Sequence, residues 1–177
     1  MLDAATPTLV FATTNDGKLR RMREHLRRAR APARVDAWRG AAIEEIQANS
    51  VREVAVAKAA LALERCDRAC AGVVAHDCGL CVRALGGFPG PYTKDFNYRV
   101  GGDGLRALLD GAGAIDRSAC WDETLVLARE GREMVVFTRE KEYGDGGGGR
   151  AEKVDAVAGR RESKRRERLR GDGVRVR

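Results

Sequence analysis

The chain has 177 residues, a net charge of +7 and 44% apolar residues. A chain of this length can bury a substantial core as one domain, and it has no run approaching the about 18 apolar residues of a membrane-spanning helix. Its charge is uneven, because residues 1–140 carry 21 Lys and Arg against 19 Asp and Glu, whereas residues 141–177 carry 12 against 7. The nearly neutral first part is not typical of a nucleic-acid-binding surface.

The predicted elements before residue 70 alternate between strands and helices. They are a strand at 8–14, a helix at 18–30, a strand at 34–38 and a helix from 51 to about 68. Leu19, Met22 and Leu26 repeat with helical spacing in the first helix. Ser50 and Glu53 form the pattern of a capping box at the start of the second helix.

The second half predicts more strand than helix. The expected elements are a strand at 72–75, its continuation or antiparallel neighbour at 80–85, a helix at 104–109, and paired strands at 118–129 and 133–138. Alternating strands and helices followed by paired strands predict an α/β fold.

The character of the chain changes after about residue 140. The glycine-rich segment 144–149 is not expected to hold regular structure, and the charged segment 151–170 has little to bury and at most forms a solvated helix. We therefore predict an α/β domain at 1–140 and a Gly- and Arg-rich basic tail at 141–177, poorly ordered or divergent. Any contact of this tail with nucleic acid would be non-specific and salt-dependent.

The five cysteines are an odd number without the spacing of a disulfide scaffold, and the N-terminus lacks the pattern of a signal peptide. We therefore expect reduced thiols and a cytoplasmic location. Cys78 and Cys81 lie three positions apart in a predicted strand and would face opposite ways, which argues against a shared zinc ion.

The segment from Thr13 to Lys18 lies between the first strand and the first helix. Backbone N–H groups at a helix N-terminus suit an anion, Lys18 adds a charge, and Thr13 and Asn15 add neutral donors. The spacing is not that of a Walker loop. The alternative interpretation is a capped helix with a solvent-exposed lysine.

Asp77 follows an apolar, strand-like run and needs a partner, a cation or a proton if it is buried. Together with a glutamate such as Glu45, it could hold Mg²⁺ over a polyphosphate. The alternative is a structural carboxylate bonded to loop amides. His76 should point to the other side of the strand, and we expect it at a surface or sheet edge.

The loop from Gly86 to Tyr92 contains two prolines and three glycines. Such a loop is stiff and can bring its backbone close to a ligand, although it could equally be an ordinary tight connection.

These motifs together resemble the inosine triphosphate pyrophosphatase family. The matching stretches are VFATTNDGKLRRMREHL, EEIQANSVREVAVAKAALA, VVAHDCGLCVRALGGFPGPYTKDF and GGDGLRALLDGAGAIDRSACWDETLVLA, in family order over about residues 8–130. The resemblance implies a mixed α/β fold in which a long twisted sheet with flanking helices forms two lobes around a cleft, in a homodimer. It also implies Mg²⁺-dependent hydrolysis of the nucleoside triphosphates ITP, XTP and dITP to monophosphate and pyrophosphate.

The resemblance also assigns roles to residues. Thr13, Asn15 and Lys18 match the triphosphate-binding motif, and Glu45 and Asp77 match metal-binding acids, with Asp77 and Lys18 in catalytic roles. The matching positions beside the nucleotide are Gly79, Gly87, Pro89, Gly90 and Tyr92.

Some positions depart from the family pattern. His76 stands where the family commonly has an acid, and Thr14 stands where it often has glycine. The family's late Asp-Pro and Ser-His-Arg segments, which select the base, have no match in this sequence. It contains no Asp-Pro pair, and its two histidines, His25 and His76, both lie in the first half. The alternative function is therefore a catalytically impaired nucleotide-binding homodimer of the same fold that has lost base recognition.

Overall fold

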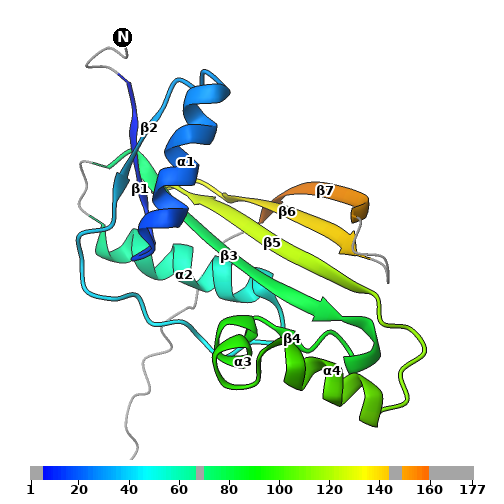
Figure 1. The fold of residues 1–177 in the computed structure, drawn as a ribbon. Coiled ribbons are helices and arrows are strands. Elements are labelled where there is room, and N and C mark those ends of the chain that lie inside the picture. The colour runs from blue at the N-terminus through cyan, green and yellow to red at the C-terminus, as the bar shows by residue number, and fades with distance from the viewer. Residues whose placement is uncertain (1–5, 67–69, 144–148, 160–177) are drawn as a thin grey trace, which may run out of the picture.

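The computed structural model describes residues 6–66 and 70–143 and the backbone of residues 149–159. Its first elements are β1 (Thr8–Phe11), α1 (Asp16–Arg28), β2 (Arg34–Ala37), α2 (Val51–Arg65), β3 (Gly72–Val82) and a short 3₁₀ turn (Arg83–Leu85) (Figure 1). They are followed by β4 (Pro89–Gly90), α3 (Thr93–Arg99), α4 (Gly101–Gly111), β5 (Ala119–Ala128), β6 (Met134–Tyr143) and β7 (Gly149–Gly159).

One mixed sheet carries the fold, with strand order β2-β1-β3-β5-β6-β7 and β4 added to β3. β1 runs parallel to β2 and β3, whereas the other neighbours are antiparallel. The helices α1 and α2 cover opposite faces, because Val73 and Ala75 of β3 pack with α2 residues, whereas Val74 packs with Leu19 of α1. This division follows the two-residue period of a strand.

The central strand β3 joins two lobes. It pairs with β5 from Val73 to Val82, but its other edge meets β1 only over residues 72–74 and β4 only over residues 80–81. Among the described strands, none pairs with that edge at residues 75–79. The predicted α/β fold with a two-lobed mixed sheet is confirmed, and α3 and α4 lie at the end of β3 remote from β1 (Figure 1).

The helix starts follow their local sequence. The Asn15 side chain accepts a hydrogen bond from the Lys18 backbone N–H at 3.0 Å and caps α1. Ser50 Oγ accepts from the Glu53 N–H at 3.2 Å while the Glu53 carboxylate accepts from the Ser50 N–H, so the predicted capping box is confirmed.

The structure decides between two alternatives left open for one segment, and it differs from the predictions at two others. β3 is continuous to Val82, which confirms residues 80–82 as its continuation and not as a separate antiparallel neighbour. α3 was not predicted, because its seven residues are too few to show a helical period. The prediction that residues 151–159 form no regular structure beyond a solvated helix is wrong, because they belong to β7, which pairs antiparallel with β6. Pairing with β6 supplies hydrogen bonds to the β7 backbone, and these bonds do not require β7 to have an apolar face to bury. The predictions for 144–148 and 160–170 lie outside the described residues.

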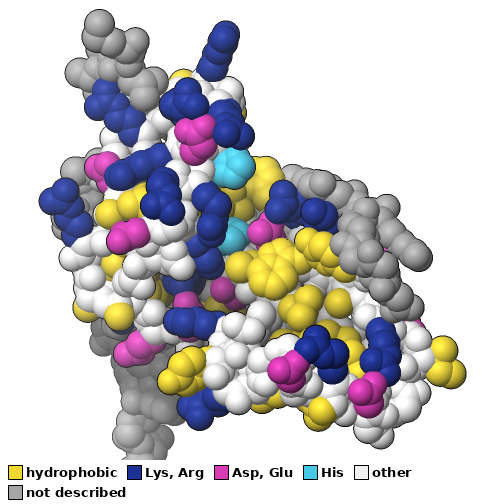
Figure 2. Space-filling model, in the orientation of Figure 1, with side chains coloured by type: hydrophobic (Ala, Val, Ile, Leu, Met, Phe, Trp, Pro, Cys, Tyr) yellow, Lys and Arg dark blue, Asp and Glu magenta, His cyan; other side chains and the backbone are white. Residues whose placement is uncertain are grey.

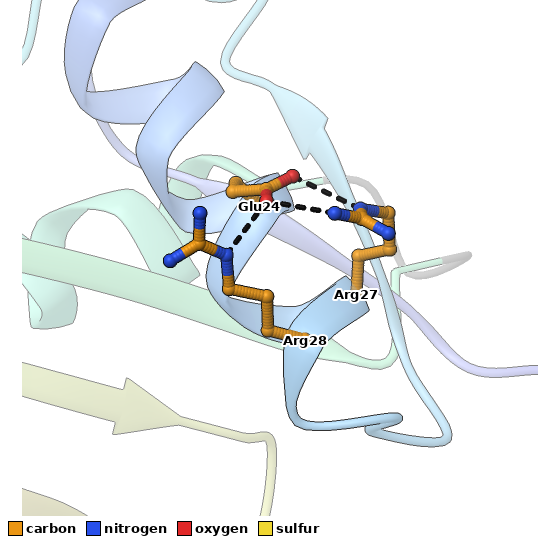
Figure 3. Close-up of polar contacts among 3 residues, drawn as sticks. All are labelled: Glu24, Arg27 and Arg28. Atoms are coloured by element: carbon orange, nitrogen blue, oxygen red, sulfur yellow. Dashed lines mark hydrogen bonds and ion pairs between the residues drawn. The ribbon is translucent and has the colours of Figure 1, made fainter.

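The outer surface of α1 is rich in arginine (Figure 2). Glu24 accepts hydrogen bonds from Arg27 at 2.8 and 3.0 Å and from Arg28 at 2.7 Å (Figure 3). These hydrogen bonds lower the pKa of Glu24 to about 2. All three side chains are solvent-exposed, so the cluster contributes little to stability. None of the helices in the described ranges has the length and apolar character needed to cross a membrane.

Candidate active site

A cavity of about 590 Å³ lies between the lobes, where the edge of β3 has no neighbouring strand among those described. It brings together residues from the turn after β1 and from α1, α2, β3, α3 and α4 that are far apart in the sequence. Of the residues with predicted roles, the cavity is lined by Thr13, Asn15, Lys18, Glu45, Asp77 and Pro89.

Lys18 is held in this cavity by the turn that precedes α1. Thr13 Oγ1 accepts a hydrogen bond from the Asn15 N–H at 3.1 Å, and Asn15 in turn caps the helix. The Lys18 Nζ donates to the backbone carbonyl of His76 at 3.4 Å, on the open edge of β3. The N-terminus of α1 therefore presents a charged side chain and its first backbone amides to one place.

Glu45 is paired with a lysine that the sequence did not single out. Lys58 Nζ donates a hydrogen bond to Glu45 Oε1, and the Lys58 side chain is only 11% exposed. Burial raises the pKa of Glu45, but the Lys58 hydrogen bond and the charges of Lys58, Lys18 and Lys94 outweigh burial and lower it overall. A signal for Lys58 existed in the sequence, because it is the one charged residue in the apolar stretch 54–63 of α2.

Asp77 lies half-buried in the middle of β3 and lines the same cavity. Its pKa is raised by burial and by the charge of Glu45, and these effects exceed the lowering by Lys18 and by the Cys78 backbone N–H. Its Oδ2 atom is buried and has no hydrogen-bond partner among the described residues. The other carboxylate oxygen is therefore the one left to face the cavity.

His76 faces the opposite side of β3, as the strand period predicts. It lines a second cavity of about 450 Å³, which also includes Arg21, Met22 and Trp121. His76 does lie at a sheet edge, where β3 has no neighbouring strand among those described, but its side chain is only partly exposed because it lines a cavity beside α1. Burial, together with the charges of Lys18 and Arg21, lowers the pKa of His76 to about 4.

The loop after β3 is fixed by its backbone rather than by contacts with the cavity. A Cβ atom on Gly79 would lie 2.1 Å from the Gly90 carbonyl oxygen, so β3 and β4 can approach only with glycine at position 79. Thr93 Oγ1 accepts from the Leu80 N–H at 2.7 Å and donates to the Gly90 carbonyl at 2.6 Å, which ties the loop to α3. Of the loop residues 86–92, Pro89 and Pro91 line the cavity.

The remaining positions predicted to lie beside the nucleotide do not line the cavity in the described part of the chain. They are Gly79, Gly87, Gly90 and Tyr92. Residues that the sequence analysis did not predict line the cavity instead on the side of α3 and α4, among them Thr93, Lys94, Asn97 and Leu105.

The donor set of the cavity suits Mg²⁺. Within the described ranges, no group of three or more His, Cys, Asp or Glu side chains could hold a metal ion. Mg²⁺ is commonly held by one or two carboxylates, with water and substrate phosphate completing its shell. Glu45 and Asp77 meet that description, and a cation beside Asp77 would offset the burial and repulsion that raise its pKa.

Comparisons with known proteins identify relatives of this chain. The family model described as "Ham1 family" matches residues 9–143. The chain is 38% identical over 107 residues to an inosine triphosphate pyrophosphatase of Mycosarcoma maydis, which covers 60% of this chain and 53% of that protein. It is 34% identical over 151 residues to a dITP/XTP pyrophosphatase of Hyperthermus butylicus, covering 80% of this chain and 73% of that protein.

Solved structures agree on the fold. A dITP/XTP pyrophosphatase from Mycobacterium abscessus superimposes with a TM-score of 0.63 at 23% identity, covering 77% of this chain and 73% of that chain. A HAM1 protein from Coxiella burnetii gives a TM-score of 0.60, also at 23% identity, and covers 77% and 72% of the two chains.

The match to the first relatives is partial in length, since the chain spans 53% of the Mycosarcoma maydis protein and 66% of an inosine triphosphate pyrophosphatase of Puccinia graminis. The family model nevertheless covers most of the chain, and the relatives include proteins named inosine triphosphate pyrophosphatase, so the predicted resemblance is confirmed. The chain belongs to the Ham1 family.

Proposed function

We propose that this chain hydrolyses the non-standard purine nucleoside triphosphates ITP, XTP and dITP to a monophosphate and pyrophosphate. The observation that carries the proposal is that Lys18, Glu45 and Asp77 line one cavity between the lobes. The names of the relatives, inosine triphosphate and dITP/XTP pyrophosphatase, support this choice of substrate.

The cationic side of the cavity would bind the triphosphate. Lys18 stands at the N-terminus of α1, where backbone amides and the helix dipole favour an anion. Lys58 and Lys94 add two further ammonium groups from α2 and α3. Charges fixed in a partly water-excluded cavity stabilise the negative oxygens of a reacting phosphoryl group.

The acidic side of the cavity would supply the proton acceptor and the metal site. Glu45 and Asp77 would hold Mg²⁺, which when bound neutralises phosphate oxygens and makes an adjacent water more acidic. The Asp77 carboxylate beside this more acidic water would accept its proton. The Asp77 carboxylate would therefore serve both as a metal ligand and as the proton acceptor.

The test is pyrophosphate release from ITP, XTP and dITP with Mg²⁺, comparing the wild type with Asp77→Asn. We expect Asp77→Asn to lower kcat about a hundredfold to ten-thousandfold, because it removes the proton acceptor. Asp36→Asn is a matched control, since Asp36 is exposed on β2 and pairs with Arg23. Equal rates for wild type and Asp77→Asn would exclude the role of Asp77.

A second candidate is nucleotide binding without turnover. It is favoured by one sequence observation, the absence of the family's Ser-His-Arg segment from a chain whose histidines are His25 and His76. Calorimetric titration with ITP separates the two functions, because binding without pyrophosphate release would support the second.

On the resemblance to the inosine triphosphate pyrophosphatase family, we also propose that the protein is a homodimer acting in the cytoplasm. Light scattering of the purified protein checks the dimer.

A further inference from the structure

Among the described residues, two buried side-chain oxygens without a hydrogen-bond partner belong to residues on neighbouring strands at the centre of the sheet. Thr124 of β5 is directly opposite Asp77 of β3 in the antiparallel register. Thr124 is 0% exposed, and its Oγ1 has no hydrogen-bond partner among the described residues. The same holds for Asp77 Oδ2, so both atoms bear the cost of desolvation without a compensating bond.

The register places these side chains within reach of each other. Residues directly opposite in an antiparallel pair share a face of the sheet, with Cβ atoms about 4.5–5.5 Å apart. A threonine hydroxyl has one proton to donate, and an ionised carboxylate can only accept. Rotation of the two side chains is therefore enough to form the bond.

The other neighbour of Thr124 need not compete for its proton. Thr138 of β6 is opposite Thr124 on its second side. Its hydroxyl can act as donor as well as acceptor, whereas the carboxylate accepts only. A bond from Thr138 to Thr124 would leave the Thr124 proton free for Asp77.

We propose that Thr124 is a positioning residue that donates its hydroxyl hydrogen bond to Asp77 Oδ2 and so orients the carboxylate toward the cavity. The inference rests on the proposed function, because it assigns Thr124 a role through Asp77. Thr124 is fully buried and cannot touch the substrate itself. Partners that orient an acid or metal ligand in this way are typically worth about tenfold to a hundredfold in activity or metal affinity.

Three substitutions test this role. Thr124→Val keeps the shape of the side chain and removes the hydroxyl, Thr124→Ser keeps the hydroxyl, and Thr138→Val removes the hydroxyl from the neighbouring strand as a matched control. For each we would measure kcat and KM for pyrophosphate release from ITP at saturating Mg²⁺. Thermal unfolding without Mg²⁺ or nucleotide and calorimetric titration with MgCl₂ in the presence of a non-hydrolysable ITP analogue complete the set.

The expected result separates function from stability. Thr124→Val should lower kcat or Mg²⁺ affinity about tenfold to a hundredfold with little change in KM, while Thr124→Ser and Thr138→Val stay within about threefold of wild type. The thermal midpoint of Thr124→Val without ligand should equal or exceed that of wild type, because a buried hydroxyl without a partner has been removed.

Two results would overturn the inference. One is a Thr124→Val protein with wild-type kcat and Mg²⁺ affinity, and the other is equal loss in Thr124→Val and Thr124→Ser. Neither is confused with failure of the proposed function, which would appear as equal rates in wild type and Asp77→Asn. If wild type releases no pyrophosphate, the Mg²⁺ titration alone decides the role of Thr124.

Discussion

On one face of β3, Asp77 shares a cavity with Glu45 and Lys58, and on the other face His76 lies in a smaller cavity with Arg21 and Met22. Burial acts on both side chains, but with opposite effects on their pKa. It raises the pKa of the Asp77 carboxyl and lowers that of the His76 imidazole, because burial disfavours whichever form is charged. Burial therefore moves the pKa of Asp77 toward neutral pH and moves the pKa of His76 away from neutral pH.

The two faces of β3 also differ in the charged groups that surround Asp77 and His76. Asp77 has carboxylate and ammonium groups around it, so that a polyphosphate and a cation would find complementary charges. His76 has cations around it and cannot gain a proton readily. We infer that the reaction belongs to the Asp77 face, and that His76 serves as a neutral side chain.

The largest effect that would test this difference concerns two cations of α1. Lys18 lines both cavities, whereas Arg21 lines the cavity of His76 but not that of Asp77. Lys18→Met should lower kcat/KM for pyrophosphate release about a hundredfold to a thousandfold, because it removes the positive charge that would stabilise the negative oxygens of the reacting phosphate. Arg21→Met serves as the matched control and should change kcat less than tenfold. Equal losses in the two variants would show that the faces do not differ in this way.

The next effect concerns stability against pH. The folded pKa of His76 is about 4 and the unfolded value is 6.5, so the unfolded chain binds the proton more readily between these values. The stability due to neutral His76 is therefore complete above pH 6.5 and is lost as the pH falls toward 4, by up to about 3 kcal/mol.

His76→Gln should lose less unfolding free energy than the wild type over that range. Chemical denaturation at a series of pH values between 4 and 8 measures the difference. If the two proteins lose stability in parallel, His76 is not buried in its neutral form and the contrast between the faces fails.

The smallest of the three effects concerns the glycine that follows the site on the Asp77 face. Gly79→Ala places a Cβ atom against the Gly90 carbonyl and should lower the free energy of unfolding by about 1–3 kcal/mol. Gly111→Ala in α4 meets nothing within 4 Å and should be neutral or stabilising by up to about 1 kcal/mol. Urea unfolding of both variants provides the test, and equal stabilities would mean that β4 can move away from β3 without cost.

Local sequence patterns predicted the elements whose signals lie within a few residues. The Asn15 and Ser50 caps start α1 and α2, and the apolar run before Asp77 predicts the buried first part of β3. The same reasoning predicted that His76 would face away from Asp77. It could not predict how deeply His76 is buried, because that depends on how α1 packs against the sheet.

The remaining features depend on contacts between distant residues. Glu45 lies in a loop without regular structure, so nothing local indicated that Lys58 would pair with it. Thr124 meets Asp77 only through the register of β3 and β5, which the sequence of neither strand specifies alone. β7 was missed because pairing with β6, rather than its own composition, makes it a strand.

The course of β3 also limits how the molecule can be rebuilt. Its first residues pair with β1 and its last with β4, while β5 accompanies it along nearly its whole length. Neither lobe can therefore be transferred alone to another protein, because both lobes contain parts of the same two strands, β3 and β5. Chimaeras that exchange the α3–α4 region with a relative should join in the loops at 86–88 and 112–118 and retain β3 and β5 from one parent.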